Sequence, residues 1–407
     1  MTVLLLATLD TKGREADFVR DTLRALGVEV ALVDTGCLGH PEVAADIPRE
    51  DVYAAAGSTL AAVRARADRG EAVAAAARGA EAIVRRRHAE GRLTGVLGLG
   101  GGAGTTIGTA AMRALPIGVP KLMVSTLASG QVAHYVGSSD VLMMNAVVDI
   151  AGLNRISRAV LTRAAQAMAG MARSGALPVD PSDRPIVAAS MFGVTTPCVE
   201  RARARLEAAG CEVLVFHATG SGGRTLEALA ASGMLAGVLD LTTTELADEL
   251  VGGFLSAGPD RLTAAGLHGI PQVVSVGALD MVNFHGIDSV PERFRGRTLY
   301  RHNANVTLMR TTSEECLELG REIGRKLAAA RGPASILFPL RGVSAIDREG
   351  QPFDDPAARA EILRGLREMR GEVPLIELDL HVNDPAFADR AADELLAHLR
   401  ARTNSRS

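Results

Sequence analysis

The 407-residue chain is poor in aromatic side chains: it contains no tryptophan, three tyrosines and nine phenylalanines. Its core must therefore be built from alanine, valine, leucine, isoleucine and methionine, and hydrophobic residues reach 47% of the chain. Proteins that bind single-stranded nucleic acid stack successive bases on several aromatic rings. The scarcity of such rings argues against a nucleic-acid partner.

An excess of charge of one sign is also missing, since 44 basic and 47 acidic residues leave a formal net charge of −3. Such a chain has no global positive field to attract nucleic acid. Long apolar runs are absent too, and none reaches the roughly 20 residues that cross a bilayer. The N-terminal stretch MTVLLLATLD has no basic region and is too short in apolar length for a signal peptide. We expect a cytoplasmic protein with no membrane partner.

Cysteine is scarce and scattered: Cys37, Cys198, Cys211 and Cys316 form no CxxC pair. Four scattered cysteines in a chain of this length support neither a disulfide scaffold nor a zinc signature. The sequence therefore predicts reduced thiols and no protein-held metal site.

The chain uses one plan twice. Each half begins with a short apolar strand, a polar loop, an amphipathic helix that ends at a glycine, and a second apolar strand. The matching segments, in order, are 2–36 with 185–220, 93–105 with 235–247, 115–126 with 267–277 and, more weakly, 140–154 with 303–317.

Strands that are continuous Val/Leu/Ile runs, alternating with helical stretches, are typical of parallel sheets covered on both faces. The predicted fold class is α/β, with two tandem Rossmann-like, doubly wound parallel-sheet domains related by internal duplication. We expect an N-terminal nucleotide-binding domain over 1–178 and a C-terminal domain over 184–407, separated near the Gly/Pro-rich segment 174–185. The C-terminal domain should carry two extra strand–helix units.

In open parallel sheets, ligands bind at the carboxyl ends of the strands. In the first domain the loops at these ends are rich in small and polar residues, and the glycine-rich loop 98–106 can present backbone N–H groups to a phosphate. The candidate binding residues are Asp10, Lys12, Thr35, Gly36, Arg69, Gly100, Gly101, Gly102, Ala103, Gly104, Thr105, Thr106, Ser125, Ser129 and Gly130.

The loop matches neither the Walker A motif, because no lysine follows the glycines, nor a regular GxGxxG fingerprint. Its partner segment in the second half has threonines instead, so the glycines are better explained by an approaching anion than by the fold. Several residues have a second interpretation. Thr105 or Thr106 can cap the following helix, Asp10 can cap a helix or hold Mg²⁺ through water, and Lys12 and Arg69 can simply face solvent.

The second domain offers a different set of groups. Gly220, Gly222 and Gly223 precede a helix and again suggest an anion site. Asp240, Glu245 and His302 are the candidate catalytic residues, as acid or base groups. Histidines 217 and 285 also lie near predicted strand ends, but their spacing is too wide for a zinc signature.

The segments ATLDTKGREADFV, GLGGGAGT, HATGSGGRTLE, HNANVTLMRTT and RGVSAIDREGQPFDDP together resemble the Tm-1-like ATP-binding family. The resemblance runs through the whole chain and implies two Rossmann-like domains with ATP in the first. It places the ATP site at Lys12, the turn 34–36, Arg69 and the loop 101–106. Where the plant member has GGSGGT, this chain has GGGAGT, so Ala103 keeps the backbone N–H but lacks a side-chain hydrogen bond.

We therefore expect ATP, with Mg²⁺, in the first domain and a second small-molecule ligand in or near the second. Two functions remain open: ATP-dependent chemistry on a metabolite, or a non-catalytic ligand sensor whose conformation ATP stabilises. The plant member's role in blocking a viral replication protein is not transferred to this chain. Because two-domain α/β proteins of this kind often pair, a homodimer is expected.

Overall fold

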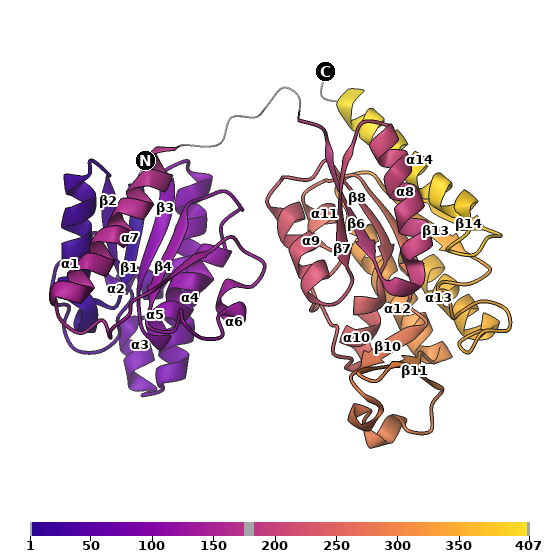
Figure 1. The fold of residues 1–407 in the computed structure, drawn as a ribbon, viewed down its shortest axis with the longest axis horizontal. Coiled ribbons are helices and arrows are strands. Elements are labelled where there is room, and N and C mark those ends of the chain that lie inside the picture. Colours follow the sequence, from indigo (N-terminus) through magenta and orange to yellow (C-terminus); the bar gives the residue numbers. More distant parts are fainter. Residues whose placement is uncertain (1, 175–182, 405–407) are drawn as a thin grey trace. The chain divides into compact units, whose positions relative to one another are not determined.

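The computed structural model describes residues 2–174 and 183–404, which belong to two compact units, residues 1–179 and 180–407 (Figure 1). We call them domain one and domain two and describe each by itself. The predicted boundary segment 174–185 lies mostly outside the described residues.

Domain one contains a five-stranded parallel sheet in the order β2-β1-β3-β4-β5. Its strands are β1 (Thr2–Ala7), β2 (Val30–Asp34), β3 (Leu93–Gly100), β4 (Lys121–Ser125) and β5 (Leu142–Asn145). Its helices are α1 (Leu9–Ala25), α2 (Arg49–Ala55), α3 (Leu60–Ala65), α4 (Arg69–Ala89), α5 (Gly102–Arg113), α6 (Ala133–Val136) and α7 (Arg155–Arg173). The chain places β2 on one side of β1 and β3, β4 and β5 on the other. Doubly wound folds bind ligands at this change in strand order, between β1 and β3.

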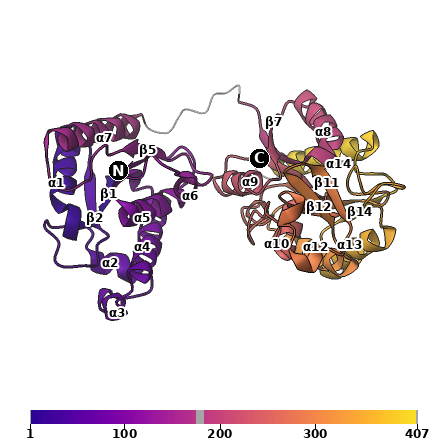
Figure 2. The same cartoon turned by 60° about the horizontal axis from the view of Figure 1, so that its bottom comes forward.

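Both faces of this sheet are covered, as the continuous apolar strands predicted. Helices α1 and α7 cover one face of the sheet, and α2, α4 and α5 cover the other (Figure 2). Val3 and Leu5 belong to the apolar cluster on the first face, and Leu4 and Leu6 to the cluster on the second. All four leucine and valine side chains are buried. This alternation is the two-residue period of a strand with helices on each side.

Domain two contains a six-stranded parallel sheet in the order β14-β13-β9-β8-β6-β7. Its strands are β6 (Ile186–Met191), β7 (Glu212–His217), β8 (Gly237–Thr242), β9 (Gln272–Gly277), β13 (Ala334–Pro339) and β14 (Leu375–Leu378). Helices α8 (Thr196–Ala208) and α14 (Pro385–Asn404) cover one face; α9 (Ser221–Ala231), α10 (Thr244–Val251), α11 (Ala264–Leu267), α12 (Ser313–Ala328) and α13 (Pro356–Met369) cover the other (Figure 1).

The duplication is visible in the sheets, because the first four strands of each domain have the same spatial order. One predicted match is wrong. Segment 303–317 does not supply the counterpart of β5; it forms β12 (Val306–Arg310), which pairs with β10 (Met281–Phe284) and β11 (Leu299–Asn303) in a separate antiparallel sheet. The place next to β9 is taken by β13. A short apolar run shows that a strand exists but not which sheet it joins.

In the described part of the chain, no helix combines the length and the hydropathy that crossing a bilayer requires.

Candidate functional site

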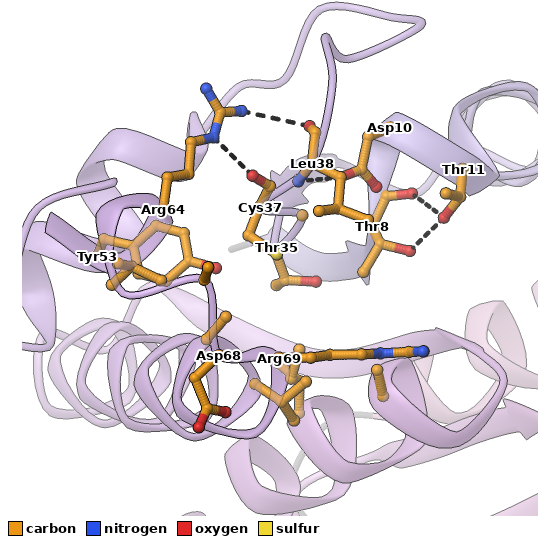
Figure 3. Close-up of a pocket in the computed structure, with 17 residues that line it drawn as sticks. Thr8, Asp10, Thr11, Thr35, Cys37, Leu38, Tyr53, Arg64, Asp68 and Arg69 are labelled. Atoms are coloured by element: carbon orange, nitrogen blue, oxygen red, sulfur yellow. Dashed lines mark hydrogen bonds between the residues drawn. The ribbon is translucent and has the colours of Figure 1, made fainter. Parts of the chain in front are cut away.

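A cavity of about 540 Å³ opens in domain one at the carboxyl ends of β1, β2 and β3 (Figure 3). This volume lies within the range of roughly 300–1,000 Å³ that small-molecule sites occupy. Its walls come from the loop after β1, the loop after β2, helix α2, the segment from α3 to α4, and the first turns of α5. The lining residues are Thr8, Asp10, Thr11, Thr35, Gly36, Cys37, Leu38, Tyr53, Val63, Arg64, Ala67, Asp68, Arg69, Ala72, Val73, Ala103 and Ile107.

A buried ion pair holds the two loops at the top of the cavity together. One oxygen of Asp34 accepts the N–H groups of Leu9 (3.1 Å) and Gly36 (2.9 Å). Its other oxygen lies 2.6 Å from Nε of Arg49, and both side chains are buried. The ends of β1 and β2 are thereby fixed relative to each other.

Asp10 strengthens the same connection and does not cap a helix. Its carboxylate accepts the N–H of Leu38 (2.7 Å), and Thr8, the N-cap residue of α1, makes no side-chain capping hydrogen bond. Arg64 donates to the carbonyl oxygens of Cys37 (2.6 Å) and Gly39 (2.9 Å) from the opposite side. The loop after β2 is therefore held rigidly over the cavity.

Gly36 is required by this arrangement. A Cβ at position 36 would lie 2.7 Å from Oδ2 of Asp10, so any larger residue would displace the carboxylate. The glycine in the predicted turn 34–36 thus lets Asp10 pack directly against the backbone.

Two polar groups are available to a ligand. Thr35 is buried and its side chain faces the cavity (Figure 3), yet its hydroxyl makes no hydrogen bond to any described residue. Arg69 is exposed at the start of α4, extends along the floor of the cavity, and has no ion-pair partner in the described ranges. Thr8 and Thr11, whose hydroxyls lie 2.9 Å apart, stand at the same end as the Arg69 guanidinium.

The opposite end of the cavity contains Tyr53 (Figure 3). This side chain is fully buried, and its hydroxyl has no regular hydrogen bond within the described chain. Burial and the neighbouring Cys37 thiol raise the pKa of Tyr53. Val63 and Ala72 also line the cavity and belong to the same apolar cluster as Tyr53, and Val73 packs against that cluster.

The glycine-rich loop divides into two kinds of glycine. A Cβ at Gly100 would lie 2.7 Å from Cα of Gly104, and one at Gly104 would lie 2.9 Å from the Leu99 carbonyl oxygen. These two are therefore required by the close packing of β3 on α5, contrary to the expectation that the fold does not need them. A Cβ at Gly102 would meet nothing, and one at Gly101 only the Thr126 hydroxyl at 3.5 Å.

Helix α5 begins at Gly102, and its N-cap Gly101 supplies no side-chain hydrogen bond. The first N–H groups of a helix have no partner within the helix, and the positive end of its dipole attracts anions. Ala103, the second residue of α5, faces the cavity. The start of α5 can therefore hold an anion there.

The remaining predicted residues of domain one do not line the cavity. The Thr105 hydroxyl lies 2.6 Å from that of Ser125, and both are buried. Thr106 donates to the Gly102 carbonyl oxygen (3.0 Å). Both threonines lie inside α5, so the expectation that either caps it is wrong.

Lys12 lies just after the lining residue Thr11, at a break in the helical backbone of α1 (φ −133°, ψ 19°). Its side chain is half-buried and is not part of the wall. Ser129 and Gly130 are exposed in the loop after β4, where Gly130 donates to the Leu127 carbonyl oxygen (3.0 Å).

The acidic candidates of domain two have a structural role. Asp240 and Glu245 are fully buried and both bind the guanidinium of Arg261, which is itself fully buried. Burial lowers the pKa of Arg261, but the carboxylates of Asp240, Glu245 and Glu227 raise it well above its ordinary value. An acid–base catalyst must reach a substrate, and these carboxylates are sealed inside an ion-pair cluster.

His302 is exposed on β11 in the antiparallel sheet and has no contact with Asp240 or Glu245. His217 is exposed at the end of β7, and the ring of His285 stacks on Phe254 with centroids 3.9 Å apart. The structure therefore does not assemble the predicted catalytic set. Within the described ranges, no group of three or more His, Cys, Asp or Glu side chains is placed to hold a metal ion.

Several residues that shape these sites were not predicted from the sequence: Asp34 as an anchor, Arg49, Tyr53, Arg64 and Arg261. The signal of the aspartate and the three arginines was weak because each acts through a partner that only folding brings close. Arg261, for example, meets Glu245 and Asp240 only through folding.

Comparison with known proteins gives a family for this architecture. Residues 1–176 match the N-terminal domain, and residues 184–399 the C-terminal domain, of the uncharacterised protein family UPF0261. The chain belongs to the UPF0261 family. It is 46% identical over 396 residues to a UPF0261 protein of Clostridium tetani, covering 97% of this chain and 98% of that protein. With a UPF0261 protein of Rhizobium meliloti it shares 50% identity over 392 residues, or 96% and 97% of the two chains.

A plant protein is also similar to this chain. The tomato (Solanum lycopersicum) ToMV resistance protein Tm-1 is 39% identical over 417 residues, which cover 97% of this chain but 55% of the tomato protein. The present chain therefore corresponds to about half of the tomato protein's length.

Proposed function

We propose that domain one binds ATP, with its phosphates at the start of α5 and its base at the end of the cavity that contains Tyr53. The observation that carries this proposal is the cavity at the change of strand order between β1 and β3. An uncapped helix start faces this one space, together with a buried hydroxyl and an arginine that have no partner among the described residues. The resemblance to the Tm-1-like ATP-binding family supports the same ligand.

Charge and polarity give the bound nucleotide a direction. Arg69, Thr8 and Thr11 lie at one end of the cavity, and Tyr53 and Asp68 at the other (Figure 3). A triphosphate would be attracted to the Arg69 guanidinium and to the N–H groups of α5, and repelled by the Asp68 carboxylate. The base is therefore assigned to the end of the cavity near Tyr53, Val63 and Val73.

Magnesium would enter with the nucleotide. Asp10 and Asp68 are the only carboxylates among the lining residues, and Mg²⁺ needs six oxygen ligands. Two carboxylates at separate points are too few to hold the ion alone, so phosphate oxygens and water would supply most of the ligands.

The test is thermal unfolding of the intact chain with ATP, ADP, AMP or NAD, each with and without Mg²⁺. A ligand that binds only the folded state raises its stability by about 2.7 kcal/mol at a hundred times its dissociation constant. We expect ATP to raise the midpoint and NAD to leave it unchanged. Stabilisation by NAD alone would contradict the assignment of the phosphate site, and no effect of any nucleotide would refute the function.

A further inference from the structure

The duplication places a carboxylate of domain two in the position of a cavity residue of domain one. Helices α5 and α10 both follow the third strand of their sheets, and they begin at Gly102 and Thr244. The second residue of α5 is Ala103, which faces the cavity, and the second residue of α10 is Glu245. The two positions are therefore equivalent in the fold.

The Glu245 side chain reaches toward the loop after the second strand, as a ligand would in domain one. Its Oε1 accepts the N–H groups of Gly220 (2.7 Å) and Gly223 (3.0 Å), at the start of α9. A carboxylate at a helix start satisfies free N–H groups and the positive end of the dipole. The glycine-rich loop of domain two, expected to bind an external anion, thus already holds one from its own chain.

The Glu245 carboxylate is tightly packed, and its charge is neutralised by an arginine. A Cβ at Gly223 would lie 2.1 Å from Oε2 of Glu245, so the glycine is needed to admit the carboxylate. The same oxygen accepts a hydrogen bond from Nε of Arg261 (2.7 Å), and both side chains are fully buried. A group enclosed in this way is part of the core and leaves no room for an incoming phosphate.

We propose that Glu245 permanently occupies the domain-two counterpart of the nucleotide cavity, and that the residue in the second position of this helix decides whether the crevice is open. Ala103, with its single methyl group, leaves the crevice of domain one open, whereas Glu245 closes that of domain two. The chain therefore binds one nucleotide, in domain one. This inference rests on the proposed function, because it concerns the same nucleotide site.

The experiment transfers the carboxylate. Ala103→Glu places in the open cavity the side chain that fills the closed one, and its charge repels a triphosphate. We expect this variant to lose about a hundredfold or more in affinity for MgATP, measured by isothermal titration calorimetry on the full chain. Ala103→Gln has nearly the same size without the charge and should lose clearly less. Ala89→Glu, exposed at the far end of α4, is the charge-matched control and should bind as the wild type does.

The wild-type titration gives the stoichiometry in the same experiment, and far-ultraviolet circular dichroism shows whether each variant is folded. One MgATP per wild-type chain, with binding lost in folded Ala103→Glu, supports the inference. Two nucleotides per chain, undiminished affinity in folded Ala103→Glu, or equal losses in the Glu and Gln variants would overturn it. If Ala103→Glu does not fold, the stoichiometry and the Gln variant decide. A wild type that binds no nucleotide would instead refute the proposed function, and this inference with it.

Discussion

Arg69 is the residue on which the orientation of the proposed nucleotide depends most. It is the one lining cation without a hydrogen bond or ion pair in the described chain, whereas Arg64 is engaged by loop carbonyl groups. A hydrogen bond to a charged group contributes roughly 1.5–3 kcal/mol. Arg69→Ala should therefore weaken MgATP binding by about tenfold or more while hardly changing AMP binding. Calorimetric titration with both nucleotides measures this, and an equal loss for AMP would place Arg69 away from the β- and γ-phosphates.

Thr35 allows the same kind of test for an uncharged hydrogen-bonding group in the cavity. Thr35→Val conserves the shape of the side chain and removes only the free hydroxyl that faces the cavity. A typical hydrogen bond contributes about 0.5–1.5 kcal/mol, so ATP affinity should fall by about two- to tenfold with no loss of stability in the free protein. Thermal unfolding with and without ATP separates the two effects. A variant with full affinity would remove Thr35 from the ligand's contacts.

Glu245 shows how a residue that reads as a catalyst in sequence can be part of the core. Removing one partner of a buried ion pair costs about 3–5 kcal/mol, because the other charge is left uncompensated. Glu245→Gln should therefore lower the unfolding free energy of domain two by several kcal/mol. Glu200→Gln, at an exposed position of α8, is the matched control and should change it little. Denaturant titration measures both; a Glu245→Gln protein as stable as the control would mean that the cluster contributes nothing to stability.

At the scale of the element, the glycines around the start of α5 are of two kinds. Some are required by the packing of the fold, and others would be required only by a bound ligand. Gly104→Ala forces a Cβ to within 2.9 Å of a backbone oxygen and should destabilise domain one by about 1–3 kcal/mol. Gly102→Ala enters open space and replaces glycine by a better helix former, so stability should be unchanged or higher. If a phosphate lies against this turn, Gly102→Ala should still reduce the stabilisation by ATP. Thermal unfolding of both variants with and without ATP checks this, and full stabilisation of Gly102→Ala would place the phosphate elsewhere.

The elements were predictable because their signals are local. Continuous apolar runs marked the buried strands, and the repeated strand–loop–helix–glycine pattern predicted two related parallel-sheet domains. The first four strands of the two domains do share one spatial order. The pattern failed at 303–317, where another short apolar run belongs to an antiparallel insertion. Register and sheet membership depend on long-range pairing, which a single run does not encode.

The cavity was predictable in outline for the same reason. Asp10, Thr35, Gly36, Arg69 and Ala103 meet at one cavity because strand ends converge at the reversal of strand order. Their part in nucleotide binding stays a prediction. The partners that fix this geometry were not predictable, since Arg49 reaches Asp34 and Arg64 reaches Cys37 only across the folded chain.

At the scale of the whole molecule, buried carboxylates make the stability of domain two depend on pH. Burial and the nearby Asp347 carboxylate raise the pKa of Asp280 to about 7, and burial raises the pKa of Asp248 to about 7. Because these folded-state values lie above that of an unfolded aspartate, about 3.9, their stabilisation is complete at low pH and is lost as the pH rises through 7. Asp280→Asn removes one such group. The free energy of unfolding of Asp280→Asn minus that of the wild type should therefore be larger at pH 8 than at pH 5.

The matched control is Asp288→Asn, at an exposed position in the same domain. The difference in unfolding free energy between Asp288→Asn and the wild type should be the same at both pH values. Thermal unfolding at pH 5 and pH 8 measures all three proteins. An Asp280→Asn difference that is independent of pH would show that this carboxyl titrates normally in the folded state.

The central claim, that domain one holds ATP in the cavity below the β1 and β2 loops, is tested most directly by titrating MgATP into the intact wild-type chain and into Ala103→Glu. We predict saturable heat with one MgATP per wild-type chain and, for the folded variant, binding that is weaker by about a hundredfold or more. Wild-type protein that gives no heat with MgATP, or that binds NAD in its place, would contradict the claim.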